Sequence, residues 1–276
     1  MASTRVLSKT KITMDLKRRR YTSHLQKGGA SISDMRHLVR IWSDNISWGK
    51  QRELLIQENI LGKKSRARSI DVYQELFVPR FLKGDPPEAW KIMKPLEMRE
   101  AHLDILKPLY YWITARSESI LYDFVTDEIL GRSKSFDKFI SVKETINWIE
   151  HKVSKQGLSW SEAVTIRVAQ GMLAALRDFG ILEGKAKKKI APIYIPIESF
   201  AYIAFALYSL GNTGEKLVVH PDWKLFLLQS PVVERLFLDA HQSKLLCYEA
   251  AGKIYRIEFY AHNMEDMANV VARRQP

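Results

Sequence analysis

Apolar residues recur at helical spacing along most of the chain. Met35, Leu38, Val39 and Trp42 follow an i, i+3, i+4, i+7 pattern, which predicts a helix capped by Ser33. The same spacing, with caps, glycines and prolines as boundaries, predicts further helices near residues 47–58, 65–79, 86–116 (broken at Pro95 and Pro108) and 117–131. The fold expected from this pattern is mostly α-helical.

The clearest local signals lie between residues 141 and 196. Ser141 to Glu144 and Ser159 to Glu162 each have the spacing of a capping box, and each precedes an apolar helical pattern. Gly180 is expected to end the second helix. Two strands are predicted next, 181–182 and 193–195, joined by a lysine-rich loop. Helix, turn, helix, strand, basic loop and strand is the order of a winged helix-turn-helix, with the lysines at the hairpin tip.

The apolar stretch 190–210 has the length of a membrane span, which is about 20 residues. It contains Pro192, Pro196 and Glu198, however, and a charge in the hydrocarbon core is costly. Ser199 resembles an N-cap, and Gly211 resembles the end of a short helix. We therefore expect a strand followed by a buried helix, with no membrane contact.

Alternation of apolar and polar residues appears near the end of the chain. Tyr255, Ile257 and Phe259 share one face of a predicted strand, which forms a hairpin with residues 245–250 around Gly252. Asn263 is expected to cap a terminal helix. Packing, oligomerisation or docking of a partner is the expected role of this last third.

Positive charge is concentrated in the first quarter of the sequence. Residues 1–70 carry 16 Lys and Arg against 5 Asp and Glu, whereas residues 190–276 carry 8 against 9. A second cluster holds four lysines between Lys185 and Lys189. Concentrated basicity is typical of a protein that binds a polyanion such as nucleic acid.

Three basic segments are therefore candidates for nucleic-acid contact. The N-terminal cluster is either a phosphate-contacting arm or a solvated tail. Residues 33–80 are expected to form a helix, a turn with a glycine and a second helix, which is either a helix-turn-helix or an ordinary helical hairpin. The helix before the lysine loop offers polar side chains on its outer side. The predicted nucleic-acid-binding residues are Arg18, Arg19, Arg20, Lys63, Lys64, Arg66, Arg68, Thr165, Arg167, Gln170, Lys185, Lys187, Lys188 and Lys189.

Sequence signatures of catalysis are weak or missing. Residues 211–216 resemble the end of a P-loop but lack its spacing, and neither H-E-x-x-H nor paired cysteines occur. Asp222-Trp-Lys224 matches half of a metal-dependent nuclease signature, although a surface turn is the favoured interpretation. The single cysteine, Cys247, and an N-terminus without a signal-peptide core favour a cytoplasmic protein. No cofactor, metal or catalytic residue is expected.

Three segments carry a resemblance to a known family. ENILGKKSRARSIDVYQELF (residues 58–77) resembles the N-terminal block of the BrxA family of BREX phage-exclusion systems, and residues 223–228 and 251–260 resemble its C-terminal block. The likeness runs in order along almost the whole chain. It implies a non-catalytic, mostly helical cytoplasmic protein that binds double-stranded DNA in bacterial antiphage defence. The family has also been likened to NusB-type RNA-binding factors, so an RNA-binding or assembly adaptor is the alternative.

The expected architecture is a mostly α helical bundle with helix-turn-helix or winged-helix-like regions and a small C-terminal β-hairpin. Its predicted regions are a basic helix-turn-helix-like part (1–80), a helical part ending in a winged helix (81–197) and a C-terminal α+β packing region (198–276). The expected partners are double-stranded DNA, other BREX components and further copies of the chain.

Overall fold

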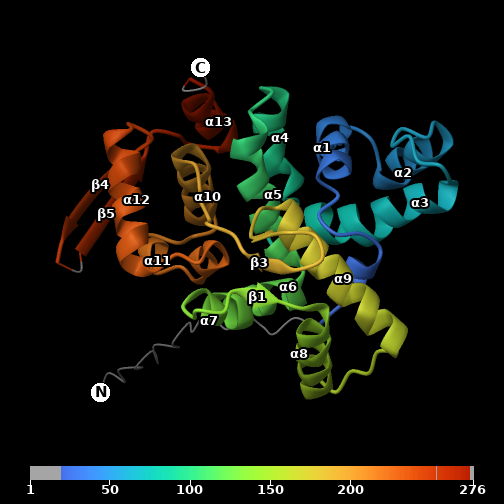
Figure 1. Ribbon diagram of the computed structural model, residues 1–276. Coiled ribbons are helices and arrows are strands. Elements are labelled where there is room, and N and C mark those ends of the chain that lie inside the picture. Colours follow the sequence, from blue (N-terminus) through green and yellow to red (C-terminus); the bar gives the residue numbers. More distant parts are fainter. Residues whose placement is uncertain (1–19, 253, 274–276) are drawn as a thin grey trace, which may run out of the picture.

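Helix α5 (Leu103–Ser117) runs through the centre of the protein in the computed structural model, which describes residues 20–252 and 254–273 (Figure 1). Its three adjacent aromatic residues, Tyr110, Tyr111 and Trp112, are all buried, because other helices surround α5. Each ring carries a polar atom that needs a partner when it is buried. Their partners are Glu97, the Leu225 carbonyl and Asp222, at 3.0, 3.0 and 2.7 Å.

The N-terminal helices lie on one side of α5, and their order agrees with the prediction. They are η1 (His24–Gln26), α1 (Ile32–Ile41), α2 (Trp48–Gln57), α3 (Arg66–Asp71) and η2 (Val72–Leu82). The predicted end at Pro79 is wrong. Hydrogen bonding changes to the wider π type at Val72, and the helix continues through Pro79 to Leu82. The wider spacing accommodates a residue that has no N–H to donate.

The remaining helices complete the bundle around α5, and the described part of the chain is mostly helical. They are α4 (Trp90–Met98), α6 (Ser119–Asp123), η3 (Phe124–Ile129), α7 (Leu130–Ser133), α8 (Val142–Lys155), α9 (Glu162–Asp178), α10 (Ile197–Ser209), α11 (Glu215–Val218), η4 (Pro221–Phe226), α12 (Ser230–Gln242) and α13 (Met264–Ala272). The predicted breaks at Pro95 and Pro108 are wrong, because both prolines lie inside helices.

The lysine loop joins two strands, as predicted, but in a different register. β2 (Leu182–Glu183) pairs with β3 (Lys188–Ile190), whereas the predicted strand at 193–195 belongs to neither sheet. A third strand, β1 (Phe139–Ile140), pairs with the other edge of β3, so the sheet order is β1-β3-β2. Gly184 has a φ of +92°, a conformation that favours glycine, and it turns the chain immediately after β2.

Two of the predicted helix caps are confirmed and three are wrong. Helix α1 has Ser31 at its N-cap position, so the predicted cap Ser33 lies inside the helix. Ser141 and Glu144 form the reciprocal capping box that begins α8, and Asn263 caps α13. Helix α9 is capped by Ser161, two residues after the predicted Ser159. Ser199 lies inside α10 and is buried, where its hydroxyl donates to the Ile105 carbonyl at 2.8 Å.

The predicted C-terminal hairpin is present. β4 (Leu246–Ala251) pairs with β5 (Ile254–Phe259) in an antiparallel sheet, and α12 packs against β4. Ile257 is buried while the outward Arg256 and Glu258 are exposed, which confirms the alternation. One hydrophobic cluster contains buried residues from all three predicted regions. In the described part of the chain, no helix combines the length and apolar character that a membrane crossing requires.

The segment 21–30, called here the arm, packs closely against α9. A Cβ on Gly171 of α9 would lie 2.0 Å from the Leu25 carbonyl oxygen, far inside contact distance. A Cβ on Gly29 would lie 3.1 Å from the Ala175 backbone nitrogen. Two glycines therefore let the arm and the helix approach at backbone distance.

Replacing Gly171 by alanine is expected to push the arm from α9, since the opposing atom belongs to the backbone and cannot rotate away. We expect the free energy of unfolding to fall by about 1–3 kcal/mol, measured by urea denaturation. Gly131→Ala is the matched control, because it also adds a methyl group to a helix but meets nothing within 4 Å. A Gly171→Ala protein as stable as the control protein would contradict the close packing.

Candidate nucleic-acid interface

One polar stripe of α9 remains exposed between the elements that cover the helix. Helix α8 packs on one side of α9 and the arm on the other. Arg167, Gln170 and Arg177 are exposed at helical spacing, with Ala163 and half-buried Ala174 on the same stripe. Arg177, which the sequence prediction missed, pairs with Asp178 at 2.8 Å. The two alanines have short side chains, so a ligand surface can come close to α9 between the longer Arg and Gln side chains.

Thr165 does not belong to this stripe, and the prediction that its side chain lies on the outer side of the helix is wrong. Its side chain is only 3% exposed, and the hydroxyl donates to the Ser161 carbonyl at 3.2 Å. Because α8 and the arm both cover α9, fewer of its side chains are exposed than the sequence predicts. Gly171 in mid-helix was the available signal, since a glycine there indicates that another backbone comes close.

The four lysines of the loop between β2 and β3 differ in their surroundings. Lys189 forms an ion pair with Glu183 across the hairpin at 2.8 Å, and the Lys188 ammonium donates to the Lys185 carbonyl at 2.9 Å. Lys185 and Lys187 are exposed, and their ammonium groups have no protein partner in the described residues. These two lysines are therefore the free cations of the hairpin tip.

A buried ion pair holds the arm in place. Arg80 of η2 and Glu118, between α5 and α6, are 0% and 1% exposed and lie 3.0 Å apart. The Arg80 guanidinium also donates to the Gly29 carbonyl at 2.9 Å and to the Gly28 carbonyl at 3.4 Å. Thr22 donates to the other Glu118 oxygen at 3.3 Å. Buried charges need this many partners because the interior solvates them poorly.

His24 on the arm adds to the same cluster. Its ring lies 3.7 Å from Glu118 and 3.9 Å from Glu75. The interaction with Glu118 raises the pKa of His24 above its ordinary 6.5, although burial and the nearby Arg80 act in the opposite direction. Burial raises the pKa of Glu118, but Arg80 and His24 outweigh that effect and lower it. Protonated His24 therefore strengthens the attachment of the arm.

The basic start of α3 contacts the arm through Arg68. Arg68 donates to the Lys27 carbonyl, and Lys63 pairs with Asp34 at 2.6 Å. Lys64 and Arg66 are exposed, with no partner among the described residues. Arg20 is exposed beside the α8–α9 turn, because the N–H of the next residue, Tyr21, donates to Gln156 at 2.9 Å. Arg18 and Arg19 lie outside the described residues.

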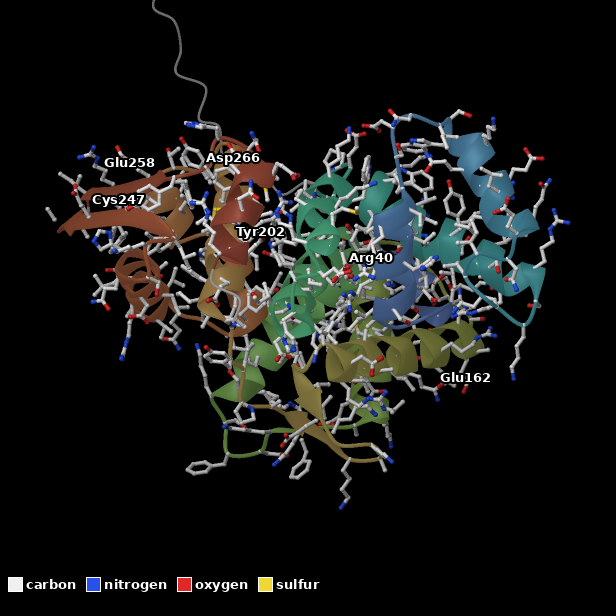
Figure 2. All side chains as sticks on the ribbon, turned by 90° about the horizontal axis from the view of Figure 1, so that it is seen from above. Arg40, Glu162, Tyr202, Cys247, Glu258 and Asp266 are labelled. Atoms are coloured by element: carbon white, nitrogen blue, oxygen red, sulfur yellow. The ribbon has the colours of Figure 1, made fainter. Side chains whose placement is uncertain are left out.

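The predicted site residues thus come together only in part. The arm contacts both the start of α3 and α9, so the basic residues of these two helices are linked through it. The lysines of the hairpin tip lie in the loop between β2 and β3, which follows α9 in the chain. Figure 2 shows Glu162, at the start of α9, on the side of the molecule away from Cys247 and Glu258 of the C-terminal hairpin.

Asp222 is buried, so the surface turn favoured for it from the sequence is wrong. It is 1% exposed and accepts hydrogen bonds from Trp112, Arg116 and Tyr122 at 2.7, 2.5 and 3.1 Å. It lies in η4 and on no paired strand. Within residues 20–252 and 254–273, no group of three or more His, Cys, Asp or Glu side chains could hold a metal ion.

A family model describing BrxA matches residues 19–206. The chain belongs to the BrxA family. Membership of the BrxA family implies a component of a BREX phage-exclusion system. A crystal structure of an uncharacterized protein from Magnetospirillum magneticum is similar, with a TM-score of 0.58 and 13% identity over 75% of this chain and 98% of that chain. At this identity the similarity shows a shared fold alone. No curated protein sequence matches the chain.

The raised pKa of His24 predicts a pH-dependent stability. The contribution of His24 to the free energy of unfolding is fully present below its pKa in the unfolded chain, near 6.5. It is lost as the pH rises through the higher pKa of the folded protein. We expect the advantage of the parent protein over His24→Gln to shrink as pH rises, measured by urea unfolding across this range. His37→Gln is the control, because His37 is exposed. A parent-to-variant difference that is independent of pH would contradict the role of His24.

Proposed function

We propose that the protein is a non-catalytic, double-stranded-DNA-binding accessory component of its BREX system, which holds the duplex mainly through phosphate contacts. The observation that carries this proposal is the order of elements from α6 to β3. The chain runs through helix, strand, two helices and a hairpin, with sheet order β1-β3-β2, and this order supports a winged helix. In that arrangement α9 takes the position of the recognition helix, which enters the major groove in helix-turn-helix proteins.

The free polar groups on α9 and the hairpin suit different parts of a duplex. Lys185 and Lys187 at the hairpin tip can reach phosphates without precise geometry, so they add affinity more than sequence preference. Arg167 and Gln170 on α9 can bond to phosphates or to base edges, since Arg pairs with guanine and Gln with adenine in the major groove. Lys64 and Arg66 at the start of α3 supply further phosphate contacts.

An RNA-binding or assembly adaptor is the competing function. A-form RNA has a deep, narrow major groove that excludes a recognition helix. Competition between duplex DNA, duplex RNA and single strands therefore separates the two functions, and preference for duplex RNA would replace the first. Incubating plasmid DNA with Mg²⁺, Mn²⁺ or Zn²⁺ tests the non-catalytic part, which cleavage by the pure protein would overturn.

The two free lysines of the hairpin give the most direct test. Lys185→Ala/Lys187→Ala is expected to weaken duplex binding and to lower the slope of log affinity against log salt by about 1.8, since each phosphate contact contributes about 0.9. Fluorescence anisotropy of a labelled duplex at several salt concentrations measures both quantities.

Lys216→Ala/Arg235→Ala is the matched control, because it removes the same charge from exposed positions in the C-terminal third. This control protein should bind duplex DNA with nearly the parent slope. Equal losses in the two variants would indicate a net-charge effect, and unchanged binding in the hairpin variant would remove the hairpin from the interface.

A further inference from the structure

A cavity lies between α7, α11, η4 and the start of α12, outside the surfaces described above. Its volume is about 290 Å³, just below the usual range of about 300–1,000 Å³ for small-molecule sites. Val218, Trp223 and Val233 are among its apolar lining residues. Figure 1 shows α7 and α11 close together beneath α12. The cavity therefore has a wall that could bury the organic part of a ligand.

The charged residues that line this cavity are all basic. Lys134 and Lys224 belong to the lining, both exposed, and no Asp or Glu side chain lines the cavity. The first turn of α12, a helix of 13 residues, also lines it at Ser230. That turn contains no acidic residue, and no side chain caps it. Pro231 has no N–H, and the N–H groups of Val232 and Val233 donate to the Gln229 carbonyl, which leaves the Ser230 N–H of this turn to face an anion. The start of a helix also carries partial positive charge, which attracts anions.

His220 provides an independent observation that points to a ligand. It lines the cavity, and its side chain is only 7% exposed. Its Nδ1 accepts a hydrogen bond from the Asp222 N–H at 3.2 Å, which leaves Nε2 to carry the proton of the neutral ring. No partner for Nε2 is found in the described residues. Burial lowers the pKa of His220, which keeps the ring neutral with Nε2–H as its donor. The ring is mostly buried and lines the cavity, so an acceptor inside the cavity can meet this Nε2–H donor.

We propose that this cavity binds a phosphate ester, with the phosphate held by Nε2 of His220, Lys134, Lys224 and the start of α12. The organic part lies against Trp223 and the neighbouring aliphatic side chains. A phosphate matches a site that offers several donors and positive charge, because its oxygens only accept and it is anionic. The site is separate from the duplex-binding surface and does not depend on the proposed function.

Two sources could supply the phosphate, a free mononucleotide or the backbone of a nucleic acid. The probes are therefore inorganic phosphate, a nucleoside 5′-monophosphate, the same nucleoside without phosphate, and a dinucleoside monophosphate with only a bridging phosphate. Isothermal titration at constant ionic strength measures each affinity. We expect saturable binding of the monophosphate and none of the nucleoside, and tighter binding of the dinucleotide would identify backbone phosphate as the source.

His220→Asn separates ligand binding from folding. The Asn side-chain oxygen can accept the Asp222 N–H in place of Nδ1, and Asn is a favoured N-cap residue, so the variant keeps the start of η4. It loses the Nε2 donor, however. We expect its affinity for the monophosphate to fall by about tenfold or more, the loss expected for one hydrogen bond to a charged group, while its urea midpoint stays near the parent value.

Lys134→Ala/Lys224→Ala should lose monophosphate binding as well, whereas Lys216→Ala/Arg235→Ala, which removes equal charge elsewhere, should keep it. The proposal is overturned if the parent binds none of the phosphates saturably, or if folded His220→Asn binds as tightly as the parent. It is also overturned if the control variant loses as much affinity as the lysine variant. Duplex binding at the hairpin is measured separately, with the hairpin variants.

Discussion

The ion pair between Arg80 and Glu118 is the constraint on which the N-terminal half of the structure depends. Both side chains are removed from water, and charges in that environment are tolerated only with several hydrogen-bonding partners. The backbone carbonyls of Gly28 and Gly29 complete the set around Arg80, and Thr22 and His24 complete it around Glu118. The arm is therefore required by the buried charges, and η2, the α5–α6 junction and the arm are fixed in one arrangement.

This arrangement determines which part of α9 can act on a ligand. The arm held by Arg80 occupies one side of α9, α8 occupies another, and the free stripe carries Arg167, Gln170 and Arg177. The same arm accepts the Arg68 hydrogen bond and so places the start of α3 relative to α9. The basic start of α3 and the polar stripe of α9 are distant in sequence, and the arm, which carries little free charge itself, connects them.

Features that depend on neighbouring residues could be predicted from the sequence, and features that depend on distant contacts could not. The Ser141–Glu144 box needs only four residues, and the faces of α1 and β5 follow from periodicity. The strand register was missed because the turn at Gly184 begins β3 at Lys188, and because β1 has only two residues. Proline predicts a helix end at Pro79, and the π-type hydrogen bonding that carries the helix past it depends on tertiary packing. The burial of Thr165 could not be predicted because it depends on how α9 packs within the bundle.

The central position of α5 has a consequence for synthesis of the protein on the ribosome. Tyr111 and Trp112 find their hydrogen-bonding partners at Leu225 and Asp222, which are separated from them by 114 and 110 residues. Domains fold as they emerge, from the N-terminus onward. One apolar face of α5 therefore stays uncovered until Asp222 and Leu225 have been made, which takes more than a hundred further residues. A chaperone that shields this face has its longest opportunity in that interval, and a chain truncated before η4 keeps the exposed surface permanently.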